Sequence, residues 1–156
     1  MPRRRPGALR AAPPAALRWD APPPERIHGL STATSLAVHR AEALAPDFDL
    51  YPGATDWALS RYREFLMPPG RRPRYPRPSL CPCPGCSMDD VRHARDVLEA
   101  VLAHLPDRAR AELGRYVARW DAAYLRRTLP DPFALDRQWR ADRWWRRRLA
   151  DGEEGS

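Results

Sequence analysis

Three cysteines that could bind a metal lie within six residues of one another, at Cys81, Cys83 and Cys86, and the chain has no other cysteine. Zinc prefers four tetrahedral ligands, and cysteine sulfurs and histidine nitrogens are among its usual ones. His93 is the nearest histidine, and a helix starting at the end of the cysteine loop would carry it within about two turns of the loop. The sequence therefore predicts a zinc site of Cys81, Cys83, Cys86 and His93.

Other interpretations of the cysteines stay open. Cys83 and Cys86 form a Cys-Pro-Gly-Cys sequence, and the N-terminus of a following helix would favour their reactive thiolates. A thiol redox protein is therefore one alternative, although a Pro/Arg segment precedes the motif where a β-α-β unit would be expected. Three ordinary thiols in a capped loop are another. If a metal is bound, His28, His39 or a cysteine of a second chain are alternative fourth ligands.

Arginine and aromatic residues occur together in two segments, the linker 68–80 and a stretch near the C-terminus. Guanidinium groups suit phosphate contacts and aromatic rings suit base stacking, while a Pro-rich segment also suits a protein partner. An anionic membrane surface is an alternative for the C-terminal segment. The plainer interpretation is a solvated connector and a helix docked on the rest of the protein. The candidate binding residues are Arg71, Arg72, Arg74, Tyr75, Arg143, Trp144, Arg147 and Arg148.

Sequence motifs of common catalytic sites are not found. The chain has neither a Gly-x-Ser-x-Gly motif nor a Gly-x-Gly-x-x-Gly phosphate loop. Most carboxylates fit helix caps or surface pairs with arginine, which leaves Cys83 or Cys86 as the candidate nucleophiles. The sequence therefore favours a binding protein over an enzyme.

The hydrophobic pattern predicts an all-α protein, because apolar residues recur at helical spacing and no persuasive strand pattern is found. Ser87, followed by Asp90 three residues later, is typical of a helix N-terminus. Pro106 interrupts the pattern between two long amphipathic stretches. We therefore expect an antiparallel hairpin of helices over about 88–105 and 107–129.

Three further helices are expected outside the hairpin. Two short ones cover 32–45 and 56–66, and Thr55 is a suitable N-cap for the second of these. A last helix, rich in arginine and tryptophan, is expected over 133–149. On this helix Trp145 lies on the apolar stripe and Trp144 among the arginines of the opposite face.

Proline divides the chain, because it restricts its own backbone and that of the residue before it. The 19 prolines cluster in the N-terminal arm, in the linker and just before the last predicted helix. Five parts are predicted: a disordered Pro/Ala/Arg arm at 1–25, two short helices at 26–67, a Pro/Arg linker at 68–80, the Cys loop with a helical domain at 81–150, and an acidic tail at 151–156.

The formal net charge is +7, and all 27 basic residues are arginine. The absence of lysine, with abundant Ala, Arg, Pro and Gly, is typical of coding in a very GC-rich bacterial genome, so part of the basicity is compositional. Residues 81–136 contain 8 arginines and 9 acidic residues, whereas 1–80 and 137–148 are strongly basic. We therefore expect only the flanking segments to attract an anionic partner.

No stretch approaches the roughly 20 apolar residues of a membrane span, and the basic N-terminus lacks the apolar core of a signal peptide. A cytoplasmic location is therefore expected. The predicted function is a small, non-catalytic binding or adaptor module, stabilised by zinc, with a protein or nucleic-acid partner at the Arg-rich segments. A thiol redox protein and a basic DNA- or RNA-binding regulator are the alternatives.

Overall fold

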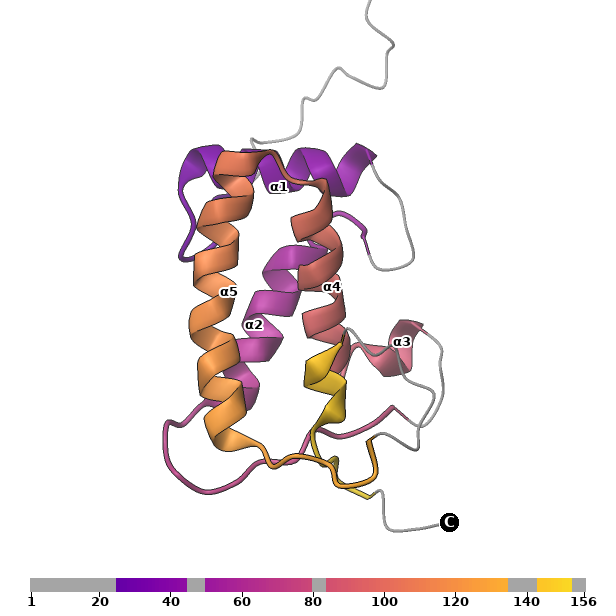
Figure 1. The fold of residues 1–156 in the computed structure, drawn as a ribbon. Helices are drawn as coiled ribbons and strands as arrows, with labels where there is room; N and C mark the ends of the chain where they lie inside the picture. The colour runs from indigo at the N-terminus through magenta and orange to yellow at the C-terminus, as the bar shows by residue number, and fades with distance from the viewer. Residues whose placement is uncertain (1–24, 45–49, 80–83, 135–142, 153–156) are drawn as a thin grey trace, which may run out of the picture.

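The computed structural model describes residues 25–44, 50–79, 84–134 and 143–152, and these form a helical bundle without a β-strand (Figure 1). The predicted all-α class is thus confirmed. None of the described helices is both long enough and apolar enough to cross a membrane. The helices are α1 (Thr32–Leu44), α2 (Ala54–Leu66), α3 (Pro84–Ser87), α4 (Val91–His104), α5 (Asp107–Arg127) and the short 3-10 helix η4 (Trp144–Arg147).

The predicted hairpin is present as α4 and α5, which run antiparallel on either side of Pro106 (Figure 1). Its first helix begins later than expected, because Asp90, and not Ser87, is the N-cap. The Asp90 carboxylate accepts a hydrogen bond from the backbone N–H of Arg92 at 2.9 Å and also holds the Arg92 guanidinium. Ser87 instead ends the separate short helix α3.

The two N-terminal helices share one hydrophobic core with the hairpin. α2 packs mainly along α4, and α1 crosses one end of the bundle, where it contacts α5 and α4 (Figure 1). The core is a single cluster that extends from Ile27 to Trp145, with Leu59 and Tyr62 of α2 fully buried against the hairpin. Residues on both sides of the Pro/Arg linker are therefore needed to complete the core.

A buried carboxylate connects α1 to α2. Glu42 is 1% exposed and accepts hydrogen bonds from the backbone N–H groups of Gly53 and Thr55, each at 2.8 Å. These donors have no partner within the first turn of a helix, and the positive end of the helix dipole favours the carboxylate. α2 consequently starts at Ala54, and Thr55, which the sequence suggested as the N-cap, lies inside the helix.

Residues 68–79, which we call the strap, are extended along the bottom of the bundle, as their prolines predict (Figure 1). The buried Arg127 at the end of α5 fastens the strap by donating hydrogen bonds to backbone carbonyl oxygens of Arg72 and Pro68, both at 2.9 Å. In return, the Arg74 N–H donates to the Arg127 carbonyl oxygen. The first half of the strap is therefore bound to the end of α5 at three residues.

The described residues of the last predicted helix, 133–149, do not form the expected α-helix. Among its described residues, the regular part is the 3-10 helix Trp144–Arg147. The backbone of 147–149 instead pairs with that of 129–131 through two hydrogen bonds and an isolated antiparallel bridge. Residues 135–142 lie outside the described part, as do most of the predicted N-terminal arm and acidic tail.

Candidate functional site

The predicted zinc ligands are only partly within the described residues. Cys86 lies in α3 and is exposed, whereas Cys81 and Cys83 fall outside the described part. His93 is buried in the first turn of α4, with its ring 5.9 Å from that of Trp57. The described residues contain no group of three or more His, Cys, Asp or Glu side chains that could hold a metal. The zinc site therefore stays a prediction.

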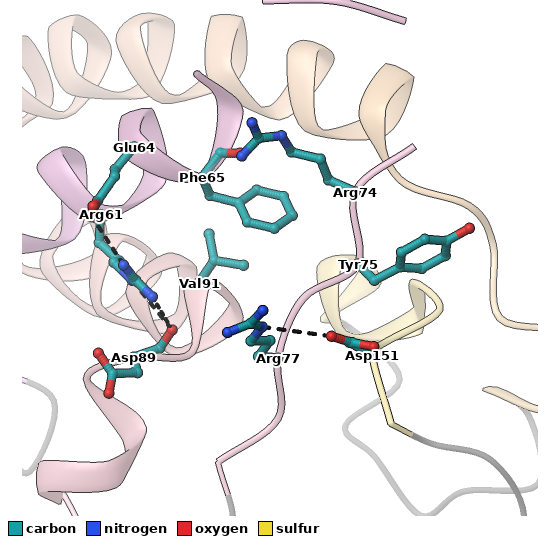
Figure 2. Close-up of a pocket in the computed structure, with 9 residues that line it drawn as sticks. All are labelled: Arg61, Glu64, Phe65, Arg74, Tyr75, Arg77, Asp89, Val91 and Asp151. Carbon is teal, nitrogen blue, oxygen red and sulfur yellow. Dashed lines mark hydrogen bonds and ion pairs between the residues drawn. The ribbon is translucent and has the colours of Figure 1, made fainter. Parts of the chain in front are cut away.

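A pocket of about 460 Å³ lies where the strap passes the end of α2 and the start of α4. Figure 2 shows the Phe65 ring and the Val91 side chain at its centre, with arginines around them. The pocket thus combines an apolar floor with a charged rim, a combination common to sites that bind small ligands or peptide segments. Its lining residues are Arg61, Glu64, Phe65, Arg74, Tyr75, Arg77, Asp89, Val91 and Asp151.

Two of the rim arginines are held in place by backbone carbonyl oxygens. Arg61 donates to the carbonyl of Asp89 at 2.6 Å and pairs with the Glu64 carboxylate at 3.1 Å. Arg74 donates to the carbonyl of Phe65 at 2.8 Å, across the C-terminal end of α2. Because last-turn carbonyls have no partner within a helix, this contact satisfies the helix end and fixes a cation beside the pocket.

The third rim arginine, Arg77, is much more accessible. Its side chain is 84% exposed, and it pairs at 3.6 Å with Asp151, which is 59% exposed (Figure 2). Exposed pairs of this kind contribute only about 0–1 kcal/mol. An incoming carboxylate or phosphate could therefore replace Asp151 at little energetic cost.

A second hollow, also about 460 Å³, adjoins this pocket and reaches Cys86. The two cavities share Arg61, Arg77 and Asp89, and the second is completed by Pro78 and Ser79 of the strap. The one described cysteine therefore lines a hollow that is continuous with the first pocket.

The four predicted binding residues of the linker lie in the strap but divide between two places. Arg74 and Tyr75 line the pocket, and Tyr75 is 42% exposed. Arg71 and Arg72 are exposed beside the end of α5, where the Arg72 carbonyl accepts from Arg127. The structure thus brings only half of this predicted set into the pocket.

The predicted binding residues near the C-terminus make contacts within the protein. Arg143 pairs with the buried Asp96 at 2.8 Å, and Arg148 donates to the hydroxyl and the carbonyl oxygen of Thr128. Trp144 is half-buried, with its ring 6.1 Å from that of Tyr124. Arg147 is half-buried as well. These contacts fit the docked segment that the sequence offered as the plainer interpretation.

Asp96 explains why this segment docks through η4. The Trp145 side chain is 3% exposed, and its indole N–H donates to Asp96 Oδ1 at 2.8 Å. Arg143 and Arg146 also bind the Asp96 carboxylate. The guanidinium of Arg95 lies 4.3 Å from the centre of the Trp145 ring, a geometry that favours cation–π attraction. The last segment is therefore fixed by one buried carboxylate and one buried ring.

A second buried network connects α2, α4 and α5. Asp121 accepts three hydrogen bonds from Arg95, the shortest at 2.9 Å, and one from the Tyr62 hydroxyl at 2.8 Å. Burial, reinforced by the Asp121 carboxylate, raises the pKa of Tyr62 far above its usual value, so the phenol stays a hydrogen-bond donor. The network sets the positions of the helices that flank the pocket.

Several pocket residues were not singled out from the sequence. Arg61 and Phe65 lie four residues apart on α2, a spacing that places them on one side of the helix. Arg77 belongs to the same arginine-rich linker as the predicted residues. Val91 and Asp151, in contrast, carry no local signal, because they reach the pocket only through the packing of the strap against the bundle.

The fold and the pocket define a small helical bundle with a bound Pro/Arg strap and an adjoining hollow that contains Cys86. Comparison with protein-family models, with curated proteins and with solved structures finds no match to the chain. The function is therefore argued from the site alone.

Proposed function

We propose that the protein is a non-catalytic binding module whose ligand site is the pocket beside the strap. The observation that supports this is the apolar floor of Phe65 and Val91 next to the accessible guanidinium of Arg77. A matching ligand is a peptide segment of a partner protein that places an apolar side chain on the floor and a carboxylate at Arg77.

The fixed parts of the rim support a ligand with this polarity. Arg61 and Arg74 already donate to backbone carbonyls, so binding need not order them again. A pre-arranged rim lowers the entropy lost on binding. Glu64, Asp89 and Asp151 balance the charge of the three arginines in the lining, which favours a peptide of mixed charge over a highly charged polyanion.

NMR titration with two matched probes tests the proposal. N-acetylleucine carries an apolar side chain and a carboxylate, and N-acetylleucinamide lacks the charge. We expect millimolar binding of the first, with amide shifts centred on Phe65, Tyr75 and Val91, and at least several-fold weaker binding of the second. Shifts scattered over the surface, or equal affinities for the two probes, would contradict this function.

A pair of variants sharpens the test. Arg77→Gln removes the accessible rim cation, whereas Arg71→Gln removes another exposed strap arginine that lies outside this pocket. Only Arg77→Gln should weaken N-acetylleucine binding. If the two variants behave alike, the carboxylate does not bind at Arg77.

The cysteine loop is part of the same proposal. Zinc held by Cys81, Cys83 and Cys86 would restrain the chain between the strap and α3, next to the hollow that contains Cys86. His93 contributes to the core through Trp57, so a thiolate of a second chain is an alternative fourth ligand. The thiol redox function remains the alternative for the same residues.

A further inference from the structure

Four exposed arginines form a straight row on the outside of α5. They are Arg108, Arg115, Arg119 and Arg126. At 100° per residue they fall within about 40° of one another around the helix axis, and the row spans roughly 27 Å. Figure 1 shows α5 along one edge of the bundle. We call this feature the α5 arginine row.

The row carries four positive charges, whereas several acidic residues of the hairpin are used in internal contacts. Asp96 and Asp121 bind arginines and aromatic side chains within the bundle. Glu112 lies beside the row, but its carboxylate accepts three hydrogen bonds from Ser31 and Thr34 at the start of α1. Residues 81–136 are nearly neutral in total, yet five of their eight arginines are exposed, whereas carboxylates such as Asp90 and Asp96 are buried.

The side chains next to the row indicate the kind of partner. Ala111, Ala118 and Ala122 form its exposed flank, so another surface can approach the helix closely. Protein interfaces are usually centred on large apolar or aromatic side chains, and membrane-binding helices insert Trp, Phe or Leu. Among the exposed side chains of α5, only Leu125, at one edge of the row, is large and apolar.

A duplex nucleic acid fits these properties best. Its phosphates provide a continuous line of negative charge, about one per 1.7 Å of helix axis in DNA. Single-stranded nucleic acid is usually bound with help from aromatic stacking, and the aromatic residues Tyr116 and Trp120 of α5 are half-buried. Arg71 and Arg72 of the strap lie beside the C-terminal end of the row and extend the basic surface.

We propose that the α5 arginine row is a binding surface for the phosphate backbone of duplex DNA, independent of base sequence. This surface is separate from the pocket, and each can fail without the other. The proposal places the DNA-binding surface within residues 81–136, although the nearly neutral net charge of this segment did not lead us to expect an anionic partner there.

The test is fluorescence anisotropy of the full chain with a labelled 20-bp duplex of mixed sequence, between 50 and 200 mM salt. Four phosphate contacts correspond to a slope of log K against log salt of about −3.6, or about 150-fold weaker binding across this range. The double variant Arg115→Gln, Arg119→Gln should reduce the magnitude of the slope by about 1.8. Arg115→Lys, Arg119→Lys should largely restore it, because the charge is retained.

The control is Arg26→Gln, Arg40→Gln, which removes the same charge from exposed positions outside both α5 and the pocket. The control should change the slope much less. The five arginines of residues 1–24 are the same in both double variants, so any binding through them does not affect the comparison. An equal change in both double variants, or no binding by the unmodified protein, would overturn the proposal. The proposal would also be overturned if the protein bound phosphatidylserine vesicles or poly-glutamate as tightly as the duplex, and through the same arginines.

Discussion

Replacing Asp96 by Asn tests the buried centre that fixes the C-terminal segment. Asp96 is 2% exposed and accepts from the Trp145 indole while pairing with Arg143 and Arg146. Asparagine has nearly the same volume and keeps one acceptor oxygen for the indole N–H. The substitution therefore removes the negative charge with little change in packing.

The expected loss of stability follows from the exposure of the partners. Removing one member of a buried ion pair costs about 3–5 kcal/mol, because the other charge stays buried without a partner. The side chains of Arg143 and Arg146 are 20% and 18% exposed, so water can solvate them in part. We therefore expect Asp96→Asn to lower the free energy of unfolding by about 2–3 kcal/mol.

Urea denaturation followed by circular dichroism at 222 nm measures this change. The control is Glu64→Gln, which breaks the pair of Arg61 with a carboxylate that is 72% exposed and should cost no more than about 1 kcal/mol. If Asp96→Asn costs no more than the control, the buried carboxylate does not hold the C-terminal segment, and this account of its docking is wrong.

Three further predictions concern other parts of the fold. Gly29→Ala should greatly reduce the free energy of unfolding in thermal denaturation, because Gly29 has φ +90° and an added Cβ would lie 2.5 Å from the Tyr116 ring. Gly53→Ala is the control: Gly53 has φ +87°, but nothing lies within 4 Å of an added Cβ, so the loss should be only about 1 kcal/mol. Hydrogen bonds from the start of α1 lower the pKa of Glu112, so their stabilisation is present above about pH 4.3 and is lost as the pH falls through the lowered pKa. Glu112→Gln should remove this part of the pH dependence in urea titrations at pH 3–6, and an unchanged dependence would contradict the assignment. Elemental analysis of protein purified under reducing conditions should find about one zinc per chain, lost with some helicity in Cys86→Ser; metal-free protein with unchanged helicity would refute the zinc prediction.

The helical hairpin could be predicted because its signals are local. Apolar residues such as Val97, Leu98 and Leu113 recur at helical spacing, and all three are buried as the pattern requires. The helix start could not be decided between Ser87 and Asp90 in the same way. Both side chains can cap a helix. Asp90 is the cap because its carboxylate accepts hydrogen bonds from both the backbone N–H and the guanidinium of Arg92.

The pocket and the arginine row could not be predicted because they depend on long-range contacts. Arg127 looks like any helix-terminal arginine in the sequence, yet it is 7% exposed and holds the strap that forms one wall of the pocket. The net charge of 81–136 likewise conceals the row. In the net charge, Asp121 cancels Arg119. In the structure the Asp121 carboxylate is bound to Arg95, whereas the Arg119 guanidinium is exposed.

Because the helices on both sides of the strap share one core, a chain that is cut in the strap should stay assembled. The strap is exposed at Gly70, Arg71 and Arg72, so a trypsin-like protease can reach it there. The N-terminal fragment would carry α2, whose buried face is completed by α4 on the other fragment. Neither fragment can bury its apolar surface alone, so a nicked molecule should stay together as a non-covalent pair and separate only when the whole bundle unfolds.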